Sequence, residues 1–144
     1  MPSENTTALA NAILSGATDD AIDQVSVTLK EPLEATVEDV LAADGIILGT
    51  TENFGYMSGL MKDFLERIYY PCLDHTEAMP YAMYVKAGND GSGAQISMER
   101  IITGLAWKPV MPATILKGDF QPDFVEQCRE IGMTLAAGLE AGIY

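Results

Sequence analysis

Apolar residues along the chain show two patterns, one typical of buried strands and one typical of amphipathic helices. Residues 45–49 (GIILG) and 80–88 (PYAMYVKAG) are short apolar runs bounded by glycine or proline, as expected of strands buried on both faces. Apolar and polar residues alternate over residues 24–30, which predicts a strand near a sheet edge. Residues 113–116 predict one more strand.

Segments with apolar residues at helical spacing separate these strands. A stripe from Leu9 to Leu14 predicts a first helix near the start of the chain. The same spacing predicts helices at residues 36–45, 59–70, 96–107 and 122–143. Helices and strands therefore alternate throughout, which indicates one α/β domain over residues 1–144 with a doubly wound parallel sheet.

Three polar loops stand where this architecture places its ligands. They read SENTT at residues 3–7, TENFGYMSG at residues 51–59 and AGNDGSGA at residues 87–94. In a sheet of order 2-1-3-4-5 the three loops meet at one edge, because ligands of such sheets bind outside the carboxyl ends of the strands. The first loop leads into a helix, and a helix N-terminus with nearby hydroxyl groups is suited to phosphate.

The net charge disfavours some classes of binding partner. The 144 residues include 21 acidic and 8 basic side chains, a formal charge of −13, which disfavours nucleic acid and anionic membranes and permits a basic protein partner. No apolar run is long enough to span a membrane and the N-terminus lacks the features of a signal peptide, so we expect a cytoplasmic protein. Cys72, Cys128 and the lone His75 form no metal-binding pattern, and we expect no metal ion.

The first loop resembles the phosphate loop of the flavodoxin-like superfamily, in particular of the small flavodoxins and the NAD(P)H-dependent flavin or quinone reductases. That loop has the pattern Ser/Thr-x-Ser/Thr-x-Asn-Thr. Ser3, Asn5 and Thr6 match its last three defined positions, while Met1 falls at the first. The resemblance covers nearly the whole chain and implies a flavodoxin-like fold.

The second loop is similar to the Pro-Thr-x-Phe-Gly-x-Met segment of the quinone reductases. Asn53, Phe54, Gly55 and Met57 keep its shape, and Thr51 and Glu52 replace the Pro and Thr. The third loop corresponds to the segment that covers the flavin edge in these families. The resemblance therefore implies FMN as the cofactor.

The expected FMN site draws on all three loops. The phosphate is expected at hydroxyl, amide and backbone N–H groups, since a protein of this charge must bind it through local donors. The flavin ring needs a flat apolar contact and close backbone approach, which an aromatic residue and glycines supply. The expected residues are Ser3, Asn5, Thr6 and Thr7 for the phosphate, and Thr51, Glu52, Asn53, Phe54, Gly55, Gly88, Asn89, Asp90 and Gly91 around the ring and ribityl chain.

Three functions are compatible with these residues. We expect first an FMN-dependent oxidoreductase that takes hydride from NAD(P)H and passes electrons to a quinone or another flavin, without a catalytic acid or base, because the flavin accepts the hydride. The alternatives are a flavodoxin-type electron carrier with a basic redox partner and a degenerate domain that no longer binds FMN. Related reductases form dimers or tetramers, so a homo-oligomer is compatible with each of these three functions. A receiver domain is disfavoured because Thr50 stands where a phosphorylatable Asp is needed.

The predicted fold class is thus a flavodoxin-like doubly wound sheet of order 2-1-3-4-5 whose strand 1 is missing from this chain. The missing strand would leave a gap of roughly 10 Å in the sheet and unpaired ladder groups on both neighbours. We therefore expect either that the natural start lies upstream of Met1, with an apolar strand before Pro2, or that the chain is unstable alone.

Overall fold

The computed structural model of the chain describes residues 3–144, which divide into two compact units. The first unit comprises the residues up to Leu29 together with Gly118–Tyr144, and the second comprises Lys30–Lys117. Within the described residues, no helix is long and apolar enough to cross a membrane. The expected organisation as one domain stays a prediction.

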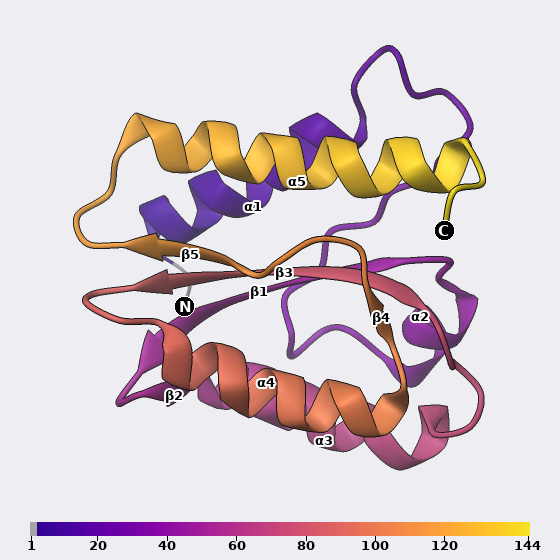
Figure 1. Ribbon diagram of the computed structural model, residues 1–144, viewed down its shortest axis with the longest axis horizontal. Coiled ribbons are helices and arrows are strands. Elements are labelled where there is room, and N and C mark those ends of the chain that lie inside the picture. The colour runs from indigo at the N-terminus through magenta and orange to yellow at the C-terminus, as the bar shows by residue number, and fades with distance from the viewer. Residues whose placement is uncertain (1–2) are drawn as a thin grey trace. The chain divides into compact units, whose positions relative to one another are not determined.

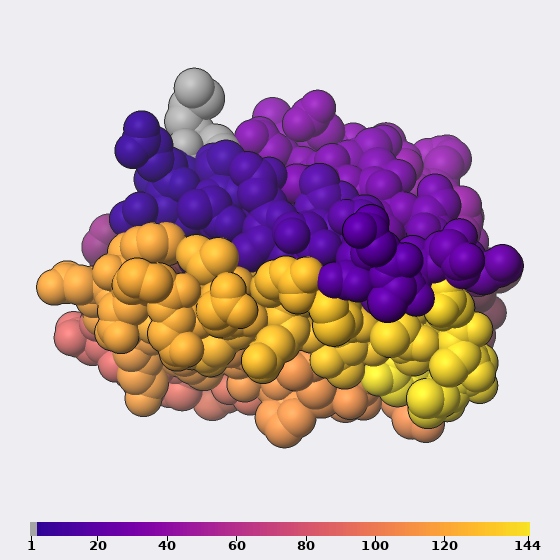
Figure 2. All heavy atoms as spheres, turned by 90° about the horizontal axis from the view of Figure 1, so that it is seen from above, coloured from indigo at the N-terminus to yellow at the C-terminus, as the bar shows by residue number. Residues whose placement is uncertain are grey.

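The first unit is a pair of helices, α1 (Glu4–Ala17) and α5 (Pro122–Glu140), which lie side by side (Figure 1). Glycines bring their backbones together. A β-carbon added to Gly16 would lie 1.9 Å from the carbonyl oxygen of Arg129, and one added to Gly132 would lie 2.1 Å from that of Ile13. Figure 2 shows α1 in indigo against α5 in orange to yellow, without a gap between their side chains. Larger residues at either glycine would force the helices apart.

Polar contacts tie the segment after α1 to α5. Arg129 forms an ion pair with Asp19 at 2.7 Å. The Glu140 carboxylate accepts hydrogen bonds from the backbone N–H groups of Asp23 at 2.8 Å and Gln24 at 2.9 Å. These backbone donors lower the pKa of Glu140, because they favour its ionised form.

The strand predicted at residues 24–30 is not formed, and that prediction was wrong. The segment is irregular, and the described sheet contains no strand from it. In the order 2-1-3-4-5 its neighbour would be strand 1, and the described residues place no strand before α1. Alternating side chains favour a strand only where a second backbone supplies the ladder hydrogen bonds.

The second unit holds the sheet. Its strands are β1 (Ile46–Asn53), β2 (Tyr56–Met57), β3 (Pro80–Ala87), β4 (Lys108–Pro109) and β5 (Thr114–Lys117). The order is β2-β1-β3-β4, with β5 also on β3, and all pairs are parallel except β1 with β2. The buried strands predicted from residues 45–49, 80–88 and 113–116 are confirmed, and β4 is an additional short strand.

Helices α2 (Val37–Ala42), α3 (Gly59–Cys72) and α4 (Ser92–Leu105) complete this unit. In Figure 1, α3 and α4 lie together on one side of the sheet. Their apolar faces and the facing strand residues form one core. It includes Leu48, Met61, Phe64, Leu65, Ile68, Met83, Met98, Ile102 and Leu105. Burial of these side chains is the main term that stabilises the unit.

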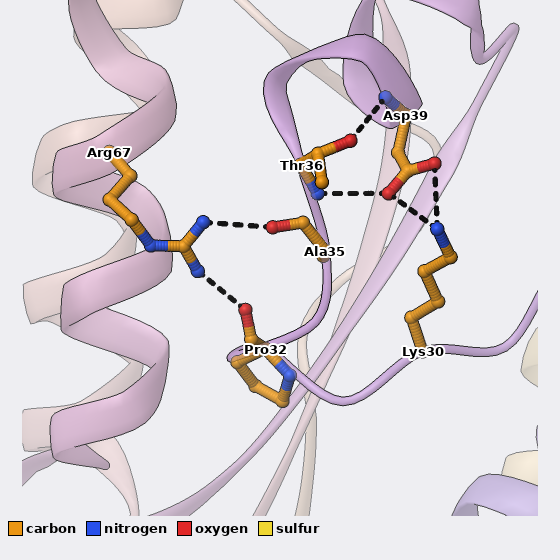
Figure 3. A network of polar contacts seen from close by, with 6 residues as sticks. All are labelled: Lys30, Pro32, Ala35, Thr36, Asp39 and Arg67. Atoms are coloured by element: carbon orange, nitrogen blue, oxygen red, sulfur yellow. Dashed lines mark hydrogen bonds and ion pairs between the residues drawn. The ribbon is translucent and has the colours of Figure 1, made fainter.

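The chain enters α2 through a polar network (Figure 3). Thr36 and Asp39 form a capping box at the helix start, and Lys30 binds the Asp39 carboxylate at 2.9 Å. The Arg67 guanidinium on α3 donates to the carbonyl oxygens of Ala35 at 2.8 Å and Pro32 at 2.6 Å. One arginine side chain thereby fixes the loop before α2 to α3.

Candidate functional site

The predicted second loop is a β-hairpin. Strand β1 continues to Asn53, the chain turns at Phe54 and Gly55, and β2 pairs back with register contacts Glu52 to Met57 and Asn53 to Tyr56. Both turn residues have positive φ, 55° and 72°, as a type I′ turn requires. Met57 lies in β2 and is only 2% exposed. Helix α3 starts at Gly59, with Ser58 as its N-cap.

Three contacts hold the hairpin against the first turns of α4. The Met57 N–H donates to the Ser97 hydroxyl oxygen at 3.3 Å, and that hydroxyl donates to the Ala94 carbonyl at 2.9 Å. A β-carbon on Gly93 would lie 2.0 Å from the carbonyl oxygen of Gly55. The third contact comes from Glu52.

Glu52 supplies the N-terminal cap of α4. The N-cap residue of this helix is Gly91, which has no side chain to accept from the free N–H groups. Instead, the Glu52 carboxylate accepts from the Gly91 N–H at 2.9 Å and from the Ala94 N–H at 3.3 Å. The negative charge also matches the positive end of the helix dipole. Glu52 therefore joins the second loop to the third, which the sequence did not indicate.

The third loop lies directly before α4, which begins at Ser92 and not at residue 96 as expected. Gly88, Asn89 and Asp90 are exposed, and the Asp90 carboxylate accepts a hydrogen bond from the Ser92 hydroxyl. Gly91 is buried with φ 86°, and a β-carbon there would lie 2.5 Å from a methyl carbon of Ile115. This glycine is thus required by its conformation and its packing.

Phe54 is the most unusual residue of the hairpin. Its side chain is fully exposed, at 108% of the reference area, although its φ of 55° places it in the left-handed region. That conformation costs a residue with a β-carbon about 1–2 kcal/mol, and here no burial offsets the cost. Tyr56, also exposed, lies under the Lys62 ammonium group at 5.9 Å from the ring centre. A strained, exposed aromatic residue is a candidate for contact with a ligand.

The backbone is open at two glycines of the second and third loops. A β-carbon added to Gly55 or to Gly88 would meet no heavy atom within 4 Å. Both glycines are exposed. The backbone of the second and third loops is therefore accessible, while Gly91 and Ala94 already donate to Glu52.

The first loop belongs to the other unit and is engaged in capping α1. The Ser3 hydroxyl oxygen accepts from the Thr6 N–H at 3.2 Å, and the Thr6 hydroxyl donates to the Ser3 carbonyl at 2.9 Å. Asn5 and Thr7 are exposed on the first turn. Met1, which falls at the first position of the phosphate pattern, lies outside the described residues. The structure brings the second and third loops together in one unit.

Two cavities lie away from the loops. One, of about 440 Å³, lies between α4, β3 and residues 109–113, and includes Tyr81 and Glu99. The other, of about 510 Å³, lies between α3 and α4 and includes Tyr69 and Arg100. Neither cavity is lined by a residue of the three loops. The described residues also contain no cluster of histidine, cysteine or carboxylate side chains that is able to hold a metal ion.

Comparison with known proteins identifies the relatives of this chain. The family model for NADPH-dependent FMN reductases matches residues 6–121. A flavodoxin from Aquifex aeolicus is 31% identical over 101 residues, which are 70% of this chain and 54% of the relative. The chain thus spans about half the length of that curated protein.

Solved structures show the same fold. A flavodoxin from the domain Archaea superposes with a TM-score of 0.81 at 18% identity, over 96% of this chain and 93% of the other. The flavodiiron protein from Giardia intestinalis has a TM-score of 0.76 at 14% identity, over 94% of this chain and 33% of that protein. The predicted flavodoxin-like α/β fold is confirmed.

Proposed function

Because this chain belongs to the NADPH-dependent FMN reductase family, a flavodoxin-like family that binds FMN, we propose that it binds FMN beside the β1–β2 hairpin and transfers electrons through it. The observation that carries the proposal is Phe54, an aromatic side chain held fully exposed in a strained turn. The turn itself is held rigidly on α4 by Glu52, Gly93 and Ser97.

The residues of the second and third loops fit a flavin ring. Phe54 would stack on one side of the ring, and the accessible backbone at Gly55 and Gly88 would lie along its edge. Thr51, Asn53, Asn89 and Asp90 are polar residues near these positions in the sequence. Ser3, Asn5, Thr6 and Thr7, at the N-terminus of the 14-residue helix α1, would hold the phosphate.

The proposed reaction is oxidation of NADPH or NADH with reduction of a small-molecule acceptor, a quinone or a flavin. FMN, when bound, supplies the hydride-accepting chemistry, and the protein positions the ring and the nucleotide. No side chain of the hairpin needs to exchange a proton in this scheme. We also propose that the protein works in the cytoplasm.

Electron transfer to a protein partner is the second candidate function. The formal charge of −13 favours association with a basic redox protein. The curated relative is named a flavodoxin, which supports this candidate as well. In that case the protein would have no substrate of its own.

One experiment distinguishes these functions. The purified chain is titrated with FMN, its visible spectrum is recorded, and the complex is mixed anaerobically with NADPH or NADH. Loss of flavin absorbance with either nucleotide supports the reductase, whereas bound flavin that neither nucleotide reduces supports the carrier. A chain that does not bind FMN refutes both and supports a degenerate domain.

A further inference from the structure

The cavity between α4, β3 and residues 109–113 has no part in the proposed function. Its volume is about 440 Å³, which is within the range of small-molecule sites. Every residue that lines it belongs to the second unit, Lys30–Lys117. No residue of the three loops lines it, so the cavity is separate from the candidate flavin site.

The walls of this cavity are largely apolar. Met83 is buried on β3, where it is part of the core of the second unit. Another wall is formed by residues 109–113 (PVMPA), which include Met111 and two prolines. The Val110 N–H donates to the Tyr81 carbonyl oxygen at 3.0 Å, which ties this wall to β3. Because each proline has a fixed φ, the segment is stiff, which favours a cavity that is formed without a ligand.

Tyr81 brings a polar group without a partner into these walls. Its side chain is only 5% exposed, and its hydroxyl makes no hydrogen bond to a described residue. No fully buried side-chain oxygen or nitrogen of the described residues lacks a partner, so this hydroxyl is accessible from the cavity that Tyr81 lines. Buried hydroxyl groups of tyrosine usually have a hydrogen-bond partner, and here a ligand can supply one.

Helix α4 adds two further oxygen acceptors. The Glu99 carboxylate forms no ion pair within the described residues and accepts a long hydrogen bond, at 3.4 Å, from Nε2 of Gln95. The amide oxygen of Gln95 has no donor among the described residues. Burial raises the pKa of Tyr81 and the charge of Glu99 raises it further, which indicates that the carboxylate lies near the hydroxyl.

We propose that this cavity binds a primary ammonium group that carries an apolar aromatic or alkyl body. An ammonium group has three N–H donors, and the oxygens of Tyr81, Glu99 and Gln95 are three acceptors that line one cavity. No described lysine, arginine or histidine lines the cavity, so the ligand would supply the positive charge that pairs with Glu99. The apolar body would lie against Met83 and Met111, whose flexible side chains adapt to varied shapes.

Other classes of ligand fit this cavity less well. A carboxylate or phosphate would be repelled by Glu99 and by the formal charge of −13. A neutral alcohol would leave the half-buried Glu99 carboxylate without a counter-charge. A divalent metal ion needs several hard oxygen ligands, and the described residues contain no cluster of side chains that is able to hold one.

The test is a calorimetric titration of the full chain, without FMN, at about 0.15 M salt to screen long-range attraction to the acidic protein. The probe is phenethylamine, which is protonated at neutral pH, and phenethyl alcohol is the uncharged control of the same shape. We expect the alcohol to bind at least about tenfold more weakly. Equal binding of the two compounds, or no binding of the amine at millimolar concentration, would overturn the proposal. This comparison needs no variant.

Three variants assign the binding to the named groups. We expect the affinity for phenethylamine to fall about tenfold in Glu99→Gln and about fivefold in Tyr81→Phe. Glu126→Gln removes one exposed carboxylate on α5, away from the cavity, and should change the affinity by less than about twofold. Unchanged affinity in Glu99→Gln, or an equal loss in Glu126→Gln, would attribute the binding to the overall charge and refute the site.

The position of the bound amine is measured by NMR of the methionine methyl groups in the parent chain. Met83 and Met111 line the cavity, whereas Met133 lies on α5 in the first unit. We expect phenethylamine to shift the Met83 and Met111 signals and to leave that of Met133 unchanged. Shifts of Met133 without shifts of the two cavity residues would refute the site. Because these measurements are made without FMN, their outcome is independent of the proposed flavin site.

Discussion

The backbones of Gly55 and Gly93 lie so close that a β-carbon on Gly93 would lie 2.0 Å from the Gly55 carbonyl oxygen. At these two residues the hairpin turn therefore contacts the first turn of α4 backbone to backbone. A residue larger than glycine at position 93 must displace the hairpin or the helix, because the clashing atom belongs to the backbone and cannot rotate away.

We predict that Gly93→Ala lowers the free energy of unfolding by about 1–3 kcal/mol. Gly59→Ala is the matched control, since Gly59 also lies in a first helical turn but a β-carbon there meets no atom within 4 Å. That variant should be as stable as the parent or up to about 1 kcal/mol more stable. Urea unfolding measures both, and a Gly93→Ala variant as stable as Gly59→Ala would contradict the close approach.

Glu52 should stabilise the fold through the cap that it gives to α4. Glu52→Ala leaves the Gly91 and Ala94 N–H groups without their acceptor, so we predict a loss of about 1 kcal/mol in unfolding free energy. Glu52→Gln keeps an oxygen acceptor and should lose less. Glu66→Ala is the control, because its exposed ion pair with Lys62 contributes little. Equal stability of all three variants would show that the cap is not formed in solution.

Phe54 is predicted to lower the stability of the fold and to strengthen FMN binding. Asn adopts positive φ more readily than Phe and is favoured before Gly in type I′ turns. Phe54→Asn should therefore raise the free energy of unfolding by about 1 kcal/mol and weaken FMN binding about tenfold. Tyr70→Asn removes another exposed aromatic side chain, on α3, and should leave FMN affinity unchanged. A stabilised Phe54→Asn variant with unchanged FMN affinity would remove Phe54 from the site.

Asp39 and Glu140 are two of the carboxyl groups through which acid should destabilise the protein. Hydrogen bonds from Lys30 and from the Thr36 backbone lower the pKa of Asp39, and backbone donors from Gln24 and Asp23 lower that of Glu140. A carboxyl group whose pKa is lower in the folded state stabilises the fold above its unfolded pKa, near 3.8 for Asp and 4.5 for Glu. That contribution is lost as the pH falls through the folded pKa.

We therefore predict that the melting temperature falls between about pH 5 and pH 3. The double variant Asp39→Asn, Glu140→Gln should melt at a lower temperature at pH 7 and show a shallower decline over the same range. Calorimetric scans at several pH values measure both. Parallel declines in the two proteins would assign the acid sensitivity to other carboxyl groups.

The sequence predicted those elements whose signals are local. Thr36 and Asp39 lie three residues apart at the start of the helix predicted at residues 36–45, and they form a capping box in the structure. The buried strands β1 and β3 were recognisable from apolar runs bounded by glycine or proline. The hairpin was not, because its turn residues Phe54 and Gly55 lack the Asn-Gly or Asp-Gly signal of a type I′ turn.

Local sequence patterns did not predict contacts between residues that are far apart in the sequence. Glu52 and Gly91 lie 39 residues apart, and nothing in either loop indicates that a carboxylate of one caps the helix of the other. Ser97 was detectable in part, as a hydroxyl on the buried face of α4, but its bond to Met57 was not. At residues 24–30 the local pattern was clear but misleading. Apolar and polar residues alternate there, yet no strand forms, because no neighbouring backbone among the described residues pairs with the segment.

The most direct test of the account is an equilibrium titration of the parent chain and of Phe54→Asn with FMN and with riboflavin. We predict saturable binding of FMN, weaker binding of riboflavin because it lacks the phosphate that Ser3–Thr7 would hold, and a loss of about tenfold for both ligands in Phe54→Asn. A parent chain that binds neither ligand, or a variant that binds both as tightly as the parent, would contradict it.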